Sequence, residues 1–169
     1  ASRLDSRVDG EGRAVLLEDQ DRSRWDRSLF RVACRWLERS RTATPTRYHY
    51  EAAIALEHCR AASVDATDWP AIVSLYDRLL ALHASPLYVL NRAVARGQAG
   101  EVERALAEIE SIRGEAEMRG YPLLDCAAGR LHELRGDRAA AAACYETALA
   151  TTRASHERAL IEEKLARVL

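Results

Sequence analysis

Apolar residues recur at spacings of three and four along most of the chain, which is the period of a helix that buries one face. Prolines and glycines separate the periodic stretches. All four prolines stand where a helix can begin, because the first N–H groups of a helix have no intrahelical partner. The pattern predicts eight helices, over about residues 23–40, 45–62, 69–82, 86–97, 101–112, 122–135, 138–151 and 156–168.

A repeat lies in the C-terminal half. The segment AGRLHELRGDRAAAAACYETAL has the small and aromatic residues of a tetratricopeptide helix pair at Gly129, Gly136, Ala141, Tyr145 and Ala148. A shift of 36 residues towards the N-terminus keeps the small-small-small-large order, at Ala93, Gly100, Ala105, Ile109 and Ile112. Such units cannot bury their apolar faces alone and must stack. We therefore expect an all-α fold, a right-handed array of about four helical hairpins that forms an α–α superhelix.

Composition and charge narrow the function classes. With 169 residues and a formal net charge of −1, the chain has the length of one domain and no overall basic field for nucleic acid or an anionic membrane. Its four cysteines form no C-x-x-C pair and fit reduced thiols. No apolar run approaches a membrane span, and the first residues contain no apolar export segment. We expect a cytoplasmic protein without a metal or cofactor.

The stretch LLEDQDRSRWD, residues 16–26, concentrates charged side chains before a tryptophan. Ser23 and Asp26 have the spacing of a capping box, which predicts a helix start. The same stretch imitates the first ligands of a calcium loop, but Arg24 replaces the turn glycine and Phe30 replaces the bidentate glutamate. The neighbouring arginines keep the carboxylates ionised, which is unsuited to acid catalysis. We interpret the stretch as a helix start and not as a metal or catalytic site.

The first predicted helix carries a basic row at Arg27, Arg31, Arg35 and Arg39. An apolar row opposes it, at Trp25, Leu29, Val32 and Trp36. Four charges without aromatic neighbours rarely define a nucleic-acid site. We interpret the basic row as a solvated face that Glu38 partly matches.

Five ordered motifs carry a family resemblance: LLEDQDRSRWD, YHYEAAIALEH, TDWPAIVSLYD, SPLYVLNRAVA and, after the glycine-punctuated repeat, ERALIEEKL. In this order they resemble the C-terminal extension of a group of extracytoplasmic-function (ECF) RNA polymerase sigma factors with a tetratricopeptide-like tail. The resemblance covers nearly everything from Arg13 onward. The sigma regions that read promoters and bind polymerase are absent, and RGQAGEVERA lacks the glycine-proline step of that family.

The resemblance implies a division of the chain and a function. Residues 1–22 would be a tether from the absent sigma regions, and residues 23–169 one tetratricopeptide-like domain. That domain would be non-enzymatic and would modulate transcription initiation. Its partners would be its own sigma regions, RNA polymerase, or a protein or peptide regulator, with DNA reached only through the absent regions and no membrane partner. A free-standing tetratricopeptide adaptor and a small-molecule-sensing helical domain remain as alternatives.

Two regions are candidate partner-binding sites. In the first, Trp25 would anchor a docking motif made of Asp19, Gln20, Asp21 and Arg22. We expect Ser23 and Asp26 to cap the helix and leave the earlier charges free for contacts across the domain boundary. In the second, the first helix of each pair lines the groove of a tetratricopeptide array, which selects Tyr88, Asn91, Arg92, Arg96 and Arg130. The alternatives are a cap with a core tryptophan, and solvated polar positions.

An enzyme would need convergent polar groups in a pocket. No nucleophile, base and orienting group stand at a plausible spacing in this sequence. The sequence therefore predicts a binding domain and no catalytic residues.

Overall fold

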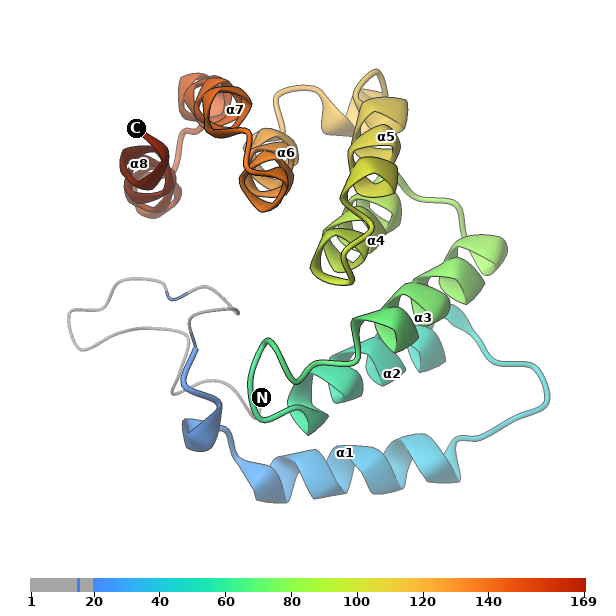
Figure 1. Cartoon of the computed structure of the whole chain (residues 1–169). Helices are drawn as coiled ribbons and strands as arrows, with labels where there is room; N and C mark the ends of the chain where they lie inside the picture. The colour runs from blue at the N-terminus through green and yellow to red at the C-terminus, as the bar shows by residue number, and fades with distance from the viewer. Residues whose placement is uncertain (1–14, 16–19) are drawn as a thin grey trace. The chain divides into compact units, whose positions relative to one another are not determined.

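The computed structural model describes residue 15 and residues 20–169, apart from the side chain of His156. Over this part the chain is all helical, without strands, and the eight predicted helices are confirmed (Figure 1). They are α1 (Arg27–Arg39), α2 (Arg47–Arg60), α3 (Trp69–Leu82), α4 (Pro86–Gln98), α5 (Val102–Ile112), α6 (Pro122–Arg135), α7 (Arg138–Thr151) and α8 (Ser155–Val168). In the described residues two short 3-10 helices accompany them, η2 (Arg22–Arg24) and η3 (Ala116–Met118).

The chain divides into two compact units. The first extends to His83 and contains α1, α2 and α3; the second runs from Ala84 to Leu169 and contains α4 to α8. Within the first unit α2 packs against both α1 and α3, and within the second each helix packs against the next. A single right-handed array, and the boundary between a tether of residues 1–22 and a domain of residues 23–169, stay predictions.

The start of the first helix differs from the prediction. Asp21 caps η2 and accepts hydrogen bonds from the N–H (2.9 Å) and the hydroxyl (2.6 Å) of Ser23. Asp26 caps α1 in the same way, from the N–H (2.8 Å) and the hydroxyl (2.6 Å) of Ser28. Two Asp-Arg-Ser tripeptides thus form two successive caps, and the predicted Ser23–Asp26 capping box is wrong. Aspartate is among the best N-cap residues, so Asp26 is the cap itself and the helix begins four residues later.

Three of the four prolines lie in the first turn of a helix, as predicted: Pro70 in α3, Pro86 in α4 and Pro122 in α6. Pro45 does not, because α2 begins at Arg47 with Thr46 as its N-cap. The Nδ1 of His49 accepts a hydrogen bond from the N–H of Thr46 at 3.1 Å, and its Nε2 lies 2.8 Å from the carbonyl oxygen of Ser40. This histidine therefore closes the start of α2.

The 36-residue repeat is confirmed in the second unit. Gly100 and Gly136 both have a positive φ, 87° and 81°, in the turns that end α4 and α6. In each turn the following N–H bonds back across the last helical turn: Glu101 to the Arg96 carbonyl, and Asp137 to the His132 carbonyl, both at 2.9 Å. The hairpins α4–α5 and α6–α7 therefore turn in the same way.

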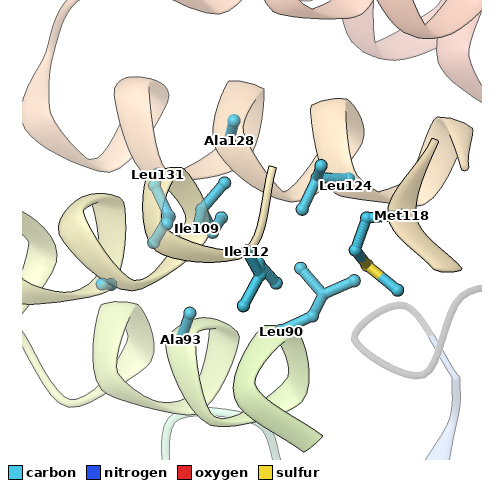
Figure 2. Packing of buried hydrophobic residues seen from close by; sticks show 9 residues of the cluster. Leu90, Ala93, Ile109, Ile112, Met118, Leu124, Ala128 and Leu131 are labelled. Carbon is cyan, nitrogen blue, oxygen red and sulfur yellow. The ribbon is translucent and has the colours of Figure 1, made fainter. Parts of the chain in front are cut away.

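The repeat positions form the core of the second unit. Ala93, Ala105 and Ile109 are wholly buried in a cluster that joins α4, α5 and α6 (Figure 2). A second cluster joins α7 and α8 around Ala141, Tyr145, Ala148, Ile161 and Val168. Between the hairpins, a β-carbon at Gly97 would collide with Leu131, so α4 and α6 touch there. Small residues at the repeat positions thus set how closely these helices approach.

Candidate interaction surfaces

The side chain of Arg22 is fixed inside the first unit. It is 4% exposed, and its Nη1 donates to the carbonyl oxygens of His58 (2.9 Å) and Ala61 (3.2 Å). The same nitrogen lies 3.1 Å from the hydroxyl oxygen of Thr67. Because α2 ends at Arg60, both carbonyls belong to its C-terminal end, where a cation also opposes the negative end of the helix dipole. The expectation that Arg22 lies free for interdomain contacts is therefore wrong.

Trp25 and Arg27 extend this attachment. Trp25 is 3% exposed, and the guanidinium carbon of Arg22 lies 5.1 Å from its ring centroid. Arg27 donates from Nη1 to the carbonyl oxygen of Cys59 at 3.1 Å. The motif of residues 20–27 thus holds the C-terminal end of α2 through Arg22 and Arg27, and the buried Trp25 lies beside Arg22. The alternative of a cap with a core tryptophan describes this geometry.

The other members of the motif have local roles. Asp21, expected to be free, caps η2, and its hydrogen bond with the Ser23 hydroxyl holds the pKa of its carboxyl below the ordinary value. Gln20 donates from Nε2 to the carbonyl oxygen of Val15 at 3.0 Å. Asp19 lies outside the described residues. Partner binding by Asp19, Gln20 and Asp21 stays a prediction, and Asp21 alone of the three is placed at the surface.

The arginines predicted to line a groove on α4 join α4 to α5 instead. Arg96 is 7% exposed; its Nη1 lies 2.6 Å from Oε2 of Glu101, and its Nε lies 2.9 Å from Oε1 of Glu108. Arg92 also binds Glu108, with Nη2 3.1 Å from Oε1. These ion pairs shield both guanidinium groups, so Arg96 is not an open groove residue. Tyr88 is half-buried and Asn91 is exposed.

Arg130 belongs to a second polar network, on α6 and α7. Its Nη1 lies 2.6 Å from Oε2 of Glu133, and the hydroxyl of Tyr145 donates to Oε1 of Glu133 at 2.7 Å. Burial and this contact raise the pKa of Tyr145. Burial opposes the ionisation of Glu133, but the hydrogen bonds from Tyr145 and Arg130 outweigh it and lower its pKa. The network holds the two helices of the hairpin together.

The first helices of the two hairpins, α4 and α6, expose large apolar side chains to solvent. The sequence reasoning missed this feature. Leu87 on α4 is 44% exposed, and its repeat equivalent on α6, Leu123, is 40% exposed. Val94 and Leu134 are also exposed large apolar residues of these two helices. We call the set Leu87, Asn91, Val94, Leu123 and Leu134 the first-helix surface. The 36-residue register could have found it, because Leu87 and Leu123 are equivalent positions.

A second exposed surface lies on α1. This helix packs against α2, yet none of its residues is buried. Trp36 is 63% exposed and Leu29 41% exposed. The sequence showed the apolar row, but not that α1 leaves part of it uncovered.

Other features of the described part of the chain are its metal-ligating residue types, its thiols and a hollow. No three histidine, cysteine or acidic side chains there are placed to hold a metal ion. The four cysteines are half-buried thiols, and burial raises the pKa of Cys126 to about 11. A hollow of about 650 Å³ opens between the start of α6 and the start of α8, lined by Arg119, Gly120, Pro122, residues 150–154 and Glu157. Among the described helices, none has the length and apolar character needed to cross a membrane.

Comparisons with known proteins found one matching family and one similar protein. Residues 1–41 match the family of unknown function DUF6596. An uncharacterised protein of Rhizobium meliloti is 37% identical over 165 residues, which are 97% of this chain and 38% of the relative. The chain therefore spans well under half the length of the relative that it matches. No solved structure matches the chain.

Proposed function

We propose that the chain is a non-enzymatic regulatory domain of an ECF sigma factor, which modulates transcription initiation by binding a protein partner in the cytoplasm. The resemblance of five ordered motifs to the tetratricopeptide-like tail of such factors suggested it. The structure supports the helical-hairpin part of that resemblance, because α4–α5 and α6–α7 repeat the same turn and the same packing positions. The partner would be the factor's own sigma regions, the polymerase or a regulator.

Two observations from the comparisons support this proposal. Members of the family that matches residues 1–41 often lie C-terminal to sigma factors, although neither match names a sigma factor. The Rhizobium meliloti relative contains a great deal of sequence beyond the matched part, as expected where such a domain is one piece of a longer protein.

The observation that carries the proposal is the first-helix surface of the second unit. Leu87 and Leu123 are equivalent in the repeat and both are exposed, on helices whose other faces are buried in one core. Exposed apolar side chains on consecutive first helices are suited to binding a peptide or helix, because their burial against a partner is favourable. Asn91, exposed between Leu87 and Val94, can add a directional hydrogen bond.

The experiment replaces Leu87 and Leu123 by glutamate in the full-length protein that carries this domain. We expect transcription from a reporter under its promoter to fall by roughly tenfold, because two charges would oppose burial of the surface. The melting temperature should stay near that of the unmodified protein, since both side chains are exposed.

Leu82→Glu is a control, because Leu82 is a 55% exposed leucine that belongs to α3 and to neither helix of the first-helix surface. Its reporter signal should equal that of the unmodified protein. If both variants leave transcription unchanged, the first-helix surface has no part in it. If deletion of the whole domain also leaves transcription unchanged, the proposed function is wrong.

A further inference from the structure

The surface of α1 combines two features that the proposed function does not use. Leu29, Ala33 and Trp36 follow one another at spacings of four and three, which places them on one side of the helix over about two turns, or ~10 Å. All three are exposed. The half-buried residues of α1 are Phe30, Val32, Cys34 and Leu37. Phe30, Cys34 and Leu37 lie about 100° to one side of the stripe and Val32 about 60° to the other, so the exposed stripe lies between them. The helix α1 packs against α2 (Figure 1).

A row of arginines lies about 120° around α1 from the stripe, and at Arg39 its side chain reaches back to the stripe. Arg31, Arg35 and Arg39 form an i, i+4 row, and all are exposed. Within the described part of the chain, Arg31 and Arg35 make no ion pair, and the guanidinium carbon of Arg39 lies 5.0 Å from the ring centroid of Trp36. The helix contains four arginines and a single acid, Glu38, although the whole chain has a net charge of −1. The positive charge is therefore local to α1.

We propose that this surface, the α1 strip (Leu29, Ala33, Trp36, Arg31, Arg35 and Arg39), binds an acidic amphipathic segment of a protein partner. The partner's apolar residues would cover Leu29 and Trp36, and its flanking carboxylates would pair with the arginine row. Tryptophan and arginine are the residues most enriched at binding hot spots, and Arg39 already holds the ring of Trp36. Charge complementarity determines the kind of partner, because α1 carries four arginines against Glu38 and the cap residue Asp26, whose carboxyl interacts with Arg31.

Two other occupants fit the strip less well. A helix that binds an anionic membrane sinks a broad apolar face into the lipid by about 5–10 Å. Because one side of α1 lies against α2, only the narrow stripe is available for that. Duplex DNA would engage the arginines but would leave Leu29 and Trp36 without an apolar partner, since direct base readout uses mainly polar side chains. An acidic amphipathic protein segment can contact both the apolar residues and the arginines of the α1 strip.

This inference rests on the proposed function in that it names a surface for the protein contact. It is tested with the full chain against a yeast-displayed library of helices of about 20 residues. The helices carry a fixed leucine ridge, and the flanking positions are randomised among glutamate, glutamine and lysine. We expect the selected helices to be rich in glutamate, and their affinity to fall by roughly tenfold or more for Trp36→Ala.

Charge reversal provides the decisive comparison. Arg31→Glu/Arg35→Glu should select lysine-rich helices instead, whereas Arg119→Glu/Arg153→Glu, which changes the net charge equally at exposed positions of the second unit, should select the same helices as the unmodified chain. Selection of neutral or basic helices by the unmodified chain, or of no helices, would overturn the proposal. So would binding to phosphatidylserine vesicles or duplex DNA that requires Arg31 and Arg35 more strongly than helix binding does.

The proposed function can fail separately. If Arg31→Glu/Arg35→Glu loses the acidic helices but leaves the reporter transcription of the full-length protein unchanged, the α1 strip binds acidic segments without regulating initiation.

Discussion

The ring of Tyr145 occupies the space beside Gly129, where a β-carbon would lie 2.7 Å from Cε1 of the ring. Tyr145 is wholly buried, and its hydroxyl is held by Glu133, so the ring cannot easily move aside. The close approach of α6 and α7 thus depends on glycine at this position of the repeat.

Gly129→Leu should overpack this contact and lower the free energy of unfolding by about 1–3 kcal/mol or more. Chemical denaturation followed by circular dichroism measures the change. Gly114→Leu is the matched control, because nothing lies within 4 Å of a β-carbon at Gly114 and its φ is not positive. Equal stability of the two variants would show that the repeat register assigned to α6 is wrong.

Tyr145→Phe should remove one hydrogen bond to a charged acceptor and destabilise the second unit by about 1.5–3 kcal/mol at neutral pH. The pKa of Glu133 is lowered in the folded protein, so its ionisation contributes stability above the ordinary carboxyl pKa, which is lost as the pH falls through the folded value. Without the Tyr145 hydroxyl this depression is smaller. The stability difference between Tyr145→Phe and the unmodified chain should therefore shrink below about pH 4, as denaturation at several pH values would show. A difference that is constant from pH 7 to pH 3 would contradict this role of Glu133.

Arg96 and Arg104 provide a comparison of two ion pairs to the same carboxylate. Both bind Oε2 of Glu101, at 2.6 Å and 3.0 Å, but the side chain of Arg96 is 9% exposed and that of Arg104 is 70% exposed. Arg96→Ala should cost about 1.5–3 kcal/mol, because it removes a nearly buried cation from both Glu101 and Glu108 and leaves Glu108 with Arg92 alone, while Arg104→Ala should cost about 0–1 kcal/mol. Thermal melts of the two variants at low and high salt measure both losses of stability. A similar loss for the two variants would indicate that Arg96 contributes no more than a surface pair.

The helices from Trp69 onward could be predicted from sequence to within about a residue because strong local signals mark them. Asp68 and Asp137 cap α3 and α7 through their own side chains, and Gly136 ends α6 with a positive φ. The start of α1 could not be predicted in this way, because two cap patterns, at Asp21 and at Asp26, follow one another within residues 21–28. Aspartate at Asp26, with Ser28 two residues later, formed a cap that the Ser23–Asp26 spacing did not reveal.

The candidate site was harder to predict because polar residue types do not disclose their partners. Arg96 and Arg22 read as exposed cations, yet the first meets a glutamate on the next helix and the second meets carbonyl groups 36 and 39 residues away. These contacts depend on how helices pack, and no short spacing encodes them. Conversely, the exposed Trp36 belonged to the predicted apolar row of the first helix, because periodicity marks an apolar face without showing whether another element covers it.

Arg22→Ala should reduce stability more than any change in the exposed part of its motif. It removes the donor to two carbonyl oxygens at the end of α2 and to the hydroxyl of Thr67, so we expect a loss of about 3 kcal/mol in the first unit. Arg24→Ala is the control, since Arg24 is exposed two residues away, and it should change stability by less than about 0.5 kcal/mol.

The same two variants separate a structural role of Arg22 from direct docking. In the full-length protein, Arg22→Ala should weaken reporter transcription at the usual growth temperature and regain it at a lower temperature, where the first unit is folded again. The reason is that a buried guanidinium acts on a partner only through the position of α2. A loss of transcription that persists at the low temperature, together with an unshifted melt of the isolated chain, would instead assign Arg22 to the partner interface. Reporter transcription with Arg24→Ala should equal that of the unmodified protein at both temperatures. A loss with Arg24→Ala would indicate that the exposed side of the motif contacts the partner.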